Sequence, residues 1–218
     1  DVVFNVVYRP HSNMALSSSG DSTLILWDLE TGQAVNTLRG HTSFAYCMAI
    51  SPDGVRAFSA SFDLSQIFWD IERGQEISRL HGHKGHVTSA VIFTEGRLIT
   101  ASNDNTLRMW DLFSADEITR ISAPAGLGMW AVAVHGQSAI TSGGSKDLFA
   151  PQAPVNPINL WDLKNGRMRG EVGSQHNTIY EAAFLPDGKS FLTVSGDFFI
   201  PGSENVMILR DTESGKEL

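Results

Sequence analysis

Leu24-Ile-Leu-Trp-Asp-Leu-Glu-Thr-Gly32 is the stretch that decides the fold, because close copies of it recur along the chain. The copies are centred on Trp69-Asp70, Trp110-Asp111 and Trp161-Asp162, and Arg210-Asp211 stands where a fifth pair is expected. The pairs follow one another at intervals of about 40 to 50 residues, which is a period typical of structural repeats. A Ser-Pro-Asp-Gly turn at 51–54 returns as Leu-Pro-Asp-Gly at 185–188 and supports the same division.

Short runs with strand character fill the intervals between these markers. In the second repeat they are Phe44–Ile50, Val55–Ser61, Gln66–Ile71 and Glu76–Leu80, each bounded by Gly, Pro, Asp or Ser. None of the intervals shows a persuasive helical period. We therefore predict an all-β protein made of four-stranded antiparallel sheets, one for each repeat.

The composition of the 218 residues favours an acidic globular protein. With 42% hydrophobic and 9% aromatic residues, the chain can bury a core, which excludes a disordered chain. The formal net charge of −8 disfavours nucleic acid, whose phosphates would be repelled. The one cysteine, Cys47, excludes an intrachain disulfide and a cysteine zinc site, and no apolar run reaches the ~18 residues of a transmembrane helix. We accordingly expect no metal, no cofactor, neither nucleic acid nor a membrane as partner, and a cytoplasmic location.

The repeated Trp-Asp motif resembles that of the WD-repeat family of β-propellers, and the resemblance covers essentially the whole chain. It implies a β-propeller of four-stranded antiparallel blades, with five blades at about 1–39, 44–81, 87–121, 128–170 and 178–218, the last one incomplete. The chain starts inside an apparent strand, and family members often close with about seven or eight blades. We therefore expect a fragment of a larger propeller. The Leu-Glu-Thr-Gly ending of the first copy is similar to that of bacterial members.

The resemblance also implies a structural role for residues that together contain the parts of a hydrolase triad. In such blades the Trp indole N–H donates to a Ser or Thr, whose hydroxyl donates to a His, which donates to an Asp. Each buried polar group thereby finds a partner. The matching residues are His41, Ser59, Ser61, Asp63 and Trp69 in the second repeat, Asp104 and Trp110 with His83 or His86 in the third, Asp21 and Trp27 in the first, and Trp161 in the fourth. In the fifth repeat Arg210 replaces the Trp, and His176 is an open match for the His. We predict no catalytic residue.

Aromatic residues near the start of the innermost strands, together with Phe62 immediately before a turn aspartate, form a first candidate surface for a partner. The candidates are Phe4, Phe44, Tyr46, Phe62, Trp130 and Tyr180. The resemblance implies that such positions line the mouth of the central channel, where rings would accept an Arg, Lys or apolar side chain. The alternative is core packing, because strict alternation puts residue 46 on the side of Ile50 unless a β-bulge redirects it.

Two long insertions form a second candidate surface. They lie within 148–157 and 198–204 and carry Phe149, Phe198 and Phe199. The resemblance implies that both lie on the top face, where the loops with the His and Asp also lie. Their prolines would lower the ordering cost of binding. The alternative is that these rings pack against one another or against the blade rim.

Together these features predict a non-enzymatic scaffold that binds a protein or peptide partner on the top face. The main alternative is a sensory or regulatory propeller of a larger multidomain chain, such as a kinase, a protease-like protein or a cytochrome fusion. A propeller enzyme would require charged or metal-binding residues that converge on the channel, and the sequence shows neither an acidic cluster nor a set of histidines there.

Overall fold

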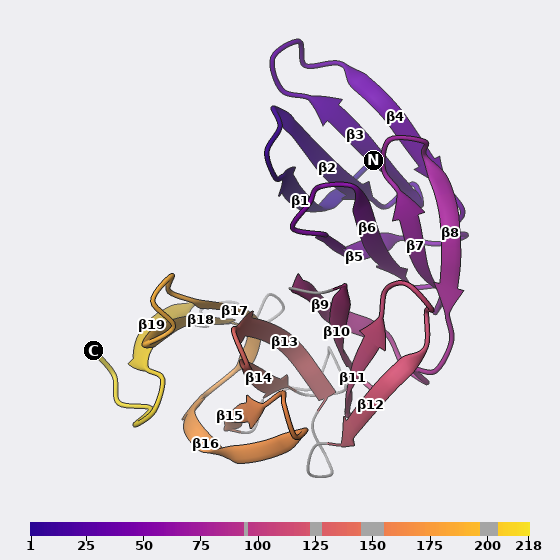
Figure 1. Cartoon of the computed structure of the whole chain (residues 1–218). Coiled ribbons are helices and arrows are strands. Elements are labelled where there is room, and N and C mark those ends of the chain that lie inside the picture. Colours follow the sequence, from indigo (N-terminus) through magenta and orange to yellow (C-terminus); the bar gives the residue numbers. More distant parts are fainter. Residues whose placement is uncertain (94–95, 123–127, 145–154, 197–204) are drawn as a thin grey trace. The chain divides into compact units, whose positions relative to one another are not determined.

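The computed structural model describes residues 1–93, 96–122, 128–144, 155–196 and 205–218 (Figure 1). Within these ranges the secondary structure consists of nineteen strands and contains no helix. The strands of each sheet are consecutive in the sequence and neighbouring strands run antiparallel. The prediction of an all-β fold made of four-stranded antiparallel blades, the last of them incomplete, is confirmed.

In the described ranges, four sheets have four strands and the last has three. The first contains β1 (Val3–Arg9), β2 (Met14–Ser19), β3 (Thr23–Asp28) and β4 (Ala34–Arg39). The second contains β5 (Ala45–Ile50), β6 (Arg56–Ser61), β7 (Gln66–Asp70) and β8 (Gln75–Leu80). The third contains β9 (Val87–Phe93), β10 (Arg97–Ser102), β11 (Thr106–Asp111) and β12 (Glu117–Ser122). The fourth contains β13 (Gly128–His135), β14 (Ser138–Gly144), β15 (Asn156–Asp162) and β16 (Arg167–Gln175), and the fifth contains β17 (Thr178–Phe184), β18 (Ser190–Gly196) and β19 (Val206–Asp211).

The chain divides into two compact units. The first unit comprises Asp1–Ile99 and Met109–Ile118. The second unit comprises Thr100–Arg108 and Thr119–Leu218.

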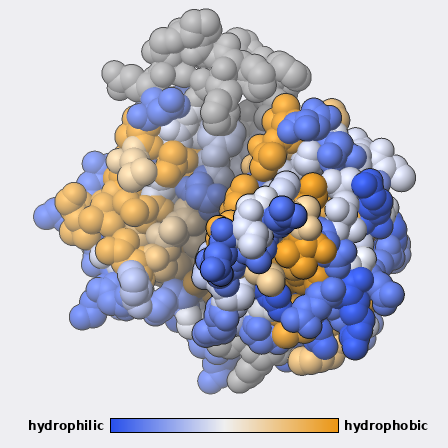
Figure 2. Space-filling model, turned by 90° about the horizontal axis from the view of Figure 1, so that it is seen from above, coloured by the Kyte–Doolittle hydropathy of each residue, from blue (hydrophilic) through white to orange (hydrophobic). Residues whose placement is uncertain are grey.

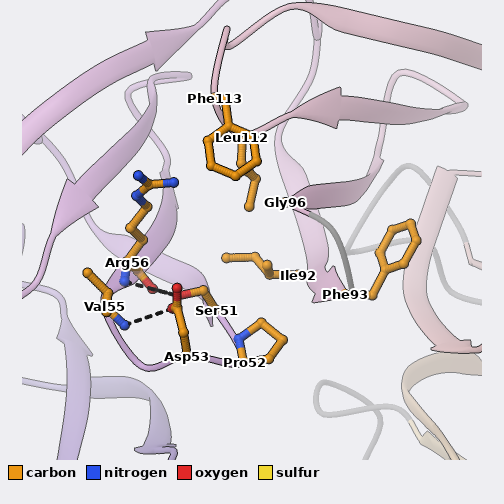
Figure 3. Close-up of a pocket in the computed structure, with 10 residues that line it drawn as sticks. All are labelled: Ser51, Pro52, Asp53, Val55, Arg56, Ile92, Phe93, Gly96, Leu112 and Phe113. Carbon is orange, nitrogen blue, oxygen red and sulfur yellow. Dashed lines mark hydrogen bonds between the residues drawn. The ribbon is translucent and has the colours of Figure 1, made fainter.

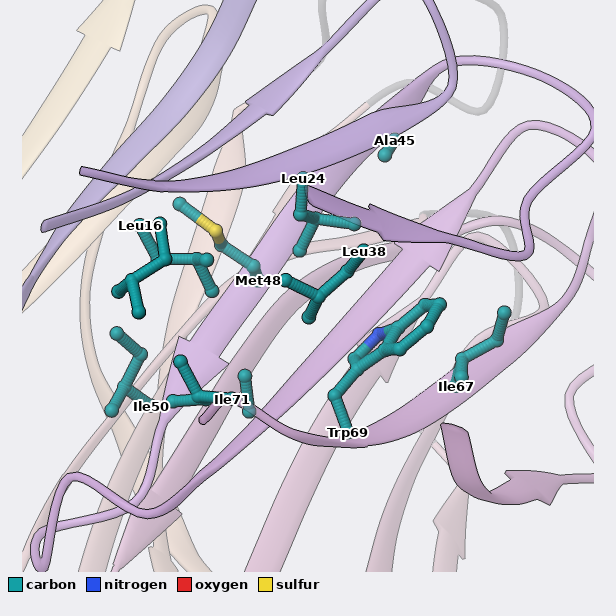
Figure 4. Close-up of a cluster of buried hydrophobic side chains, with 11 residues drawn as sticks. Leu16, Leu24, Leu38, Ala45, Met48, Ile50, Ile67, Trp69 and Ile71 are labelled. Atoms are coloured by element: carbon teal, nitrogen blue, oxygen red, sulfur yellow. The ribbon is translucent and has the colours of Figure 1, made fainter. Parts of the chain in front are cut away.

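In the first unit, alternate residues of β7 point into two different hydrophobic cores. Ile67 and Trp69 pack into a core shared with β2, β3 and β4 of the preceding sheet, where they meet Leu24 and Leu38 (Figure 4). Phe68, between them in sequence, packs into a second core with residues of the third sheet. Because successive side chains of a strand point to opposite faces, a sheet that is covered on both faces needs a continuous apolar run.

Tight turns join the strands of each sheet. In the turn between β5 and β6, the amide of Gly54 donates to the carbonyl of Ser51 at 2.8 Å. The carboxylate of Asp53 accepts the Ser51 hydroxyl at 2.5 Å and the amide of Val55 at 3.0 Å. Gly54 has φ +71°, a value that side chains disfavour. The turn is therefore specified locally by Asp and Gly.

The second unit has a core between the fourth and fifth sheets. Ile140, Ile158 and Leu160 of the fourth sheet pack there with Ile179 and Phe191 of the fifth. In the three-stranded fifth sheet, Arg210 of β19 also forms an isolated antiparallel bridge with Glu217.

Candidate functional site

The four candidate aromatics of the innermost strands each occupy a β-bulge. The pairing of β1 with β2 skips Phe4, and that of β5 with β6 skips Tyr46. In the same way, the pairing of β13 with β14 skips Trp130, and that of β17 with β18 skips Tyr180. A bulge adds one residue to a strand and redirects its side chain, so these four side chains are released from the ordinary alternation.

The effect of the bulge is clearest around Tyr46. Ile50 and Met48 point into the core shared with the first sheet, and so does Ala45. Cys47 points into the other core, although it is only two residues from Ala45. Tyr46 packs against that second core. The bulge therefore moves Tyr46 away from the side of Ile50, to which strict alternation would assign it.

Five rings of the first unit form a continuous cluster, which we call the aromatic string. The ring centroid of Phe44 lies 5.9 Å from that of Phe4 and 6.0 Å from that of Phe62. Phe62 in turn lies 4.7 Å from Tyr46 and 4.8 Å from His86. These separations are those of favourable aromatic pairs.

Three members of the aromatic string are widely open to solvent. Phe4, Phe44 and Phe62 expose 46%, 48% and 43% of their surface. Hydrophobic residues reach the surface at several places among hydrophilic ones (Figure 2). The string differs from scattered exposed residues because its rings contact one another, which makes a continuous apolar patch typical of a binding surface.

Sequence reasoning did not identify His86 as a member of this patch. The sequence left His83 and His86 as alternatives for the histidine of the third repeat. In the structure, the ring of His83 lies 6.1 Å from that of Trp110, the same separation as between His41 and Trp69. His86 instead joins the aromatic string. A usable signal was its place immediately before β9, as Phe44 stands immediately before β5.

Two buried polar atoms of the aromatic string have no hydrogen-bond partner among the described residues. They are the hydroxyl oxygen of Tyr46 and Nδ1 of His86. Burial raises the pKa of Tyr46 above its ordinary value, so its hydroxyl remains a neutral donor. Unpaired buried polar groups are costly, and water or a ligand that reaches them would recover that cost.

Carboxylates adjoin the aromatic string in the turns between the second and third strands. Asp63 follows Phe62 directly, and Asp21 follows Gly20, where an added β-carbon would lie 3.5 Å from the ring of Phe4. The hydrogen bond from the Thr23 hydroxyl is the largest effect that lowers the pKa of Asp21. The pKa of Asp63 also lies below its ordinary value, so both carboxylates are ionised at neutral pH.

The second unit holds the two remaining candidate rings. Trp130 and Tyr180 lie 6.0 Å apart with their planes at 78°, an edge-to-face arrangement. Both are half-buried.

Beneath the exposed rings, the second sheet contains a chain of buried hydrogen bonds. The indole N–H of Trp69 donates to Oγ of Ser59 at 2.7 Å, and Nε2 of His41 also lies 2.7 Å from that oxygen. Nδ1 of His41 lies 2.7 Å from Oγ of Ser65 but 3.6 Å from Oδ2 of Asp63. The closest partner of Nδ1 is thus Ser65, where the resemblance implied a direct bond to Asp63.

This arrangement lowers the pKa values of both His41 and Asp63, which favours a neutral imidazole and an ionised carboxylate. Burial lowers the pKa of His41, against the attraction of the Asp63 carboxylate. For Asp63, burial alone would raise the pKa, but hydrogen bonds from Ser65 and from the amide of Thr42 outweigh it and hold the pKa well below its ordinary value. Since Ser59 accepts from the indole, its own proton is available to a neutral His41, and the network is satisfied without a charge on the imidazole.

Other sheets contain parts of the same network. Trp27 donates to Oγ of Ser17 at 2.8 Å, and Trp161 donates to Oγ1 of Thr141 at 2.7 Å. In the second sheet itself, Ser61 donates to the carbonyl of Ser43. Asp21 and Asp104 each accept the hydroxyl of the Thr two residues later, at 2.6 Å.

The fifth sheet departs from this pattern. Arg210, at the Trp position, binds the carbonyl of Ser174 and pairs with Glu217 at 3.0 Å. His176 is exposed, whereas the neighbouring Gln175 is buried and donates to Oγ of Ser195 at 3.2 Å. The tryptophan-centred network is therefore replaced here by one centred on an arginine.

The geometry around Ser59 suits a scaffold better than a hydrolase. Ser59 is fully buried and its oxygen is already shared by Trp69 and His41. A nucleophile must reach a substrate, and this hydroxyl cannot.

In the described part of the chain, no group of three or more His, Cys, Asp or Glu residues could hold a metal ion. No helix in that part is long and apolar enough to span a membrane.

The second candidate surface lies outside the described residues. It includes Phe149, Phe198 and Phe199, which belong to 145–154 and 197–204. Its role stays a prediction.

Comparison with known proteins identifies the repeats. The family model described as "WD domain, G-beta repeat" matches residues 1–28, 32–70 and 74–111. The three matches end at or next to the first three Trp-Asp pairs, which are the markers that the sequence reasoning used.

Several curated proteins are similar to most of this chain. A guanine nucleotide-binding protein subunit beta of Zea mays is 26% identical over 89% of the chain and 53% of its own length. Nuclear distribution protein PAC1-2 of Uncinocarpus reesii is 27% identical over 85% of the chain and 34% of its own length. Mitogen-activated protein kinase kinase kinase A of Dictyostelium discoideum is 37% identical over 77% of the chain and 18% of its own length.

The chain therefore spans between about a fifth and about half of the length of these relatives. The relatives come from a plant, a fungus and a social amoeba, so the expected similarity to bacterial members is not borne out.

Proposed function

The chain belongs to the WD-repeat family, and from this premise we propose that it is a non-catalytic scaffold that binds a protein partner through the aromatic string. WD-repeat proteins act as protein-interaction scaffolds, and the maize relative is by its name a subunit. The single observation that carries the proposal is the contact of three half-exposed phenylalanines, Phe4, Phe44 and Phe62, in one patch.

The chemistry of the patch favours a basic anchor residue from the partner. Aromatic faces attract an Arg or Lys side chain, and the ionised Asp21 and Asp63 beside them add a negative potential. The unpartnered atoms of Tyr46 and His86 offer hydrogen bonds to the same segment. The aromatic side chains are held by bulges and by each other, so little conformational freedom is lost on binding.

A capture experiment tests this surface. The protein with Phe44→Ser and Phe62→Ser is used as bait in an extract of its own host, beside the unaltered protein. We expect the double substitution to remove partners that the unaltered protein captures. A second bait with a photo-reactive aromatic amino acid at position 62 is expected to cross-link to the same partner.

The matched control is Ile77→Ser, which alters a similarly exposed side chain on the outermost strand of the same sheet. It is expected to retain the partners. Equal capture by the double variant, with its thermal unfolding unchanged, would contradict the proposal.

The two insertions around 148–157 and 198–204 are a second proposed contact with the partner. Deleting residues 149–156, or changing Phe149, Phe198 and Phe199 to Ser, is expected to abolish capture while unfolding remains cooperative. Retained capture by these variants would confine binding to the aromatic string.

A regulatory propeller within a larger protein is the second candidate function. It is favoured by the match to the kinase of Dictyostelium discoideum, of which the aligned part forms only 18%. Sequencing the flanks of this chain tests it: a kinase or other catalytic domain on either side is the expected finding, and flanks that hold only further repeats would oppose it.

A further inference from the structure

A second surface of the first unit lies at the opposite end of β6 from the aromatic string. It is a groove with a volume of about 380 Å³. The turn between β5 and β6 forms one wall, with Pro52 and Arg56, and Leu112 and Phe113 after β11 form another (Figure 3). Ile92 of β9 lies between them. The groove is therefore apolar along its floor and carries a guanidinium at its edge.

The guanidinium of Arg56 has no hydrogen bond and no ion pair within the part of the chain that the structure describes. In the β6–β7 ladder Arg56 lies opposite Asp70, but the Asp70 carboxylate pairs with Arg73 at 2.8 Å. Cζ of Arg56 instead lies 5.2 Å from the ring centroid of Phe113. In the next sheet, by contrast, Arg97 at the start of β10 pairs with Asp111 at 3.8 Å.

Phe113 is unusual among the repeats. The corresponding residues, two after the Asp of each Trp-Asp or Arg-Asp pair, are charged in the other repeats: Glu30, Glu72, Lys164 and Glu213. Phe113 leaves 73% of its surface exposed. Its ring nevertheless has a defined place against Gly96, where a β-carbon would collide with it. The repeats thus place an exposed aromatic ring and an unpaired arginine together at this groove.

The other charged groups that the structure describes at the groove already have partners. Asp53 accepts hydrogen bonds from the Ser51 hydroxyl and the Val55 amide. Arg9, which approaches the same turn, donates to the carbonyl of Gly54 and pairs with Glu72. Among the described residues at the groove, Arg56 is therefore the cation that has no hydrogen bond or ion pair, while its charge also helps to lower the pKa of Asp53.

We propose that this groove binds an acidic peptide segment, in which a Glu or Asp carboxylate pairs with Arg56 and a neighbouring aliphatic side chain enters the groove. A planar guanidinium binds a carboxylate through two parallel hydrogen bonds, and the ring of Phe113 holds it in a stacked orientation. Pro52, Ile92 and Leu112 then cover the aliphatic side chain. Aromatic residues and arginine are the types that dominate binding energy at protein interfaces.

The test is a fluorescence anisotropy titration of the purified protein with a labelled peptide, Gly-Glu-Leu-Glu-Leu-Gly. We expect binding that Arg56→Gln weakens about tenfold or more, the loss typical of a charged hydrogen-bonded pair. Phe113→Ser is expected to weaken binding as well. Arg97→Gln is the matched control: it removes a cation from the same strand position of the next sheet, and the affinity should not change.

Two further peptides separate charge from shape. In one of them Gln replaces both Glu residues, and in the other Lys replaces them. Both are expected to bind at least about tenfold more weakly than the acidic peptide. The proposal is overturned if the acidic peptide does not bind, if the Gln peptide binds as well, or if Arg56→Gln and Arg97→Gln behave alike. Circular dichroism of each variant checks that the sheets are intact. The double variant Phe44→Ser with Phe62→Ser, which alters the aromatic string, should leave the affinity for the acidic peptide unchanged.

Discussion

The indole nitrogen of Trp69 lies 2.7 Å from Oγ of Ser59, and both residues are shielded from solvent in the second sheet. The same oxygen lies 2.7 Å from Nε2 of His41, so one hydroxyl satisfies two buried nitrogens. Burial without such a partner costs free energy for each group. A serine that resembles a nucleophile in the sequence therefore acts as the centre of a structural hydrogen-bond network.

Ser59→Ala should lower the free energy of unfolding by about 2 to 4 kcal/mol, because it leaves both nitrogens without a partner. Urea denaturation followed by tryptophan fluorescence measures the change. Ser122→Ala, which alters an exposed serine of β12, is the control and should change stability by less than about 0.5 kcal/mol. Equal stability of the two variants would mean that the network does not stabilise the sheet.

Gly40→Ala should destabilise the protein by about 1 to 3 kcal/mol through overpacking. A β-carbon at position 40 would lie 2.9 Å from the ring of Trp69, which is buried and has no room to move. Gly170→Ala is the matched control, because no atom lies within 4 Å of its new β-carbon. Thermal unfolding compares the two. A lower melting temperature for Gly170→Ala than for Gly40→Ala would refute the steric explanation for the glycine before His41.

The stability of the protein should fall as the pH is lowered through 6.5, and His41 is the residue responsible. Burial lowers the pKa of His41 from its ordinary value of 6.5, so the unfolded chain takes up a proton before the folded protein does. The contribution is complete above pH 6.5 and is lost as the pH falls toward the folded-state pKa. Asp63 has a lowered pKa as well, and its contribution is lost only below its ordinary value of 3.8.

Urea midpoints measured between pH 8 and pH 5 test this assignment. His41→Gln should be less stable at pH 8 but should show a flatter dependence over that range. An unchanged slope in His41→Gln would assign the dependence to other groups. Asp63, Glu76 and Arg79 all act on His41 electrostatically, so the measurement is made at more than one ionic strength.

Tyr46→Phe should preserve or raise the free energy of unfolding, by up to about 1 kcal/mol, because it removes a buried hydroxyl that has no partner. The same change should weaken capture of the partner if the Tyr46 hydroxyl forms its hydrogen bond with the partner. Tyr8→Phe, in which the lost hydroxyl donates to the carbonyl of Ser12, is the comparison for stability and should be slightly destabilising. A Tyr46→Phe protein that is clearly less stable would show that the hydroxyl is satisfied in the folded state.

The parts of the site that the sequence predicted are those that depend on neighbouring residues. The Trp-Asp repeats and the turn at 51–54 led to the four-stranded sheets. The pairing of Trp69 with Ser59 was expected from the resemblance to the WD-repeat family. The choice between His83 and His86 could not be made, because one extra residue in that segment makes both histidines compatible with the repeat. The packing of His83 against Trp110 and of His86 against Phe62 separates them.

The sequence by itself determined that this is a repeated all-β protein, because alternation and turn chemistry act over a few residues. The polar network of the blades was expected only from the resemblance of the Trp-Asp motif to a known family. Only the tertiary structure decided which side chains meet across blades. Phe4 and Phe44 lie far apart in the chain, and their contact depends on the packing of β1 against β5 and on the bulge at Phe4. Arg56 reaches Phe113 rather than Asp70 for the same kind of reason: the position of a long side chain follows from which partners its neighbours have already taken.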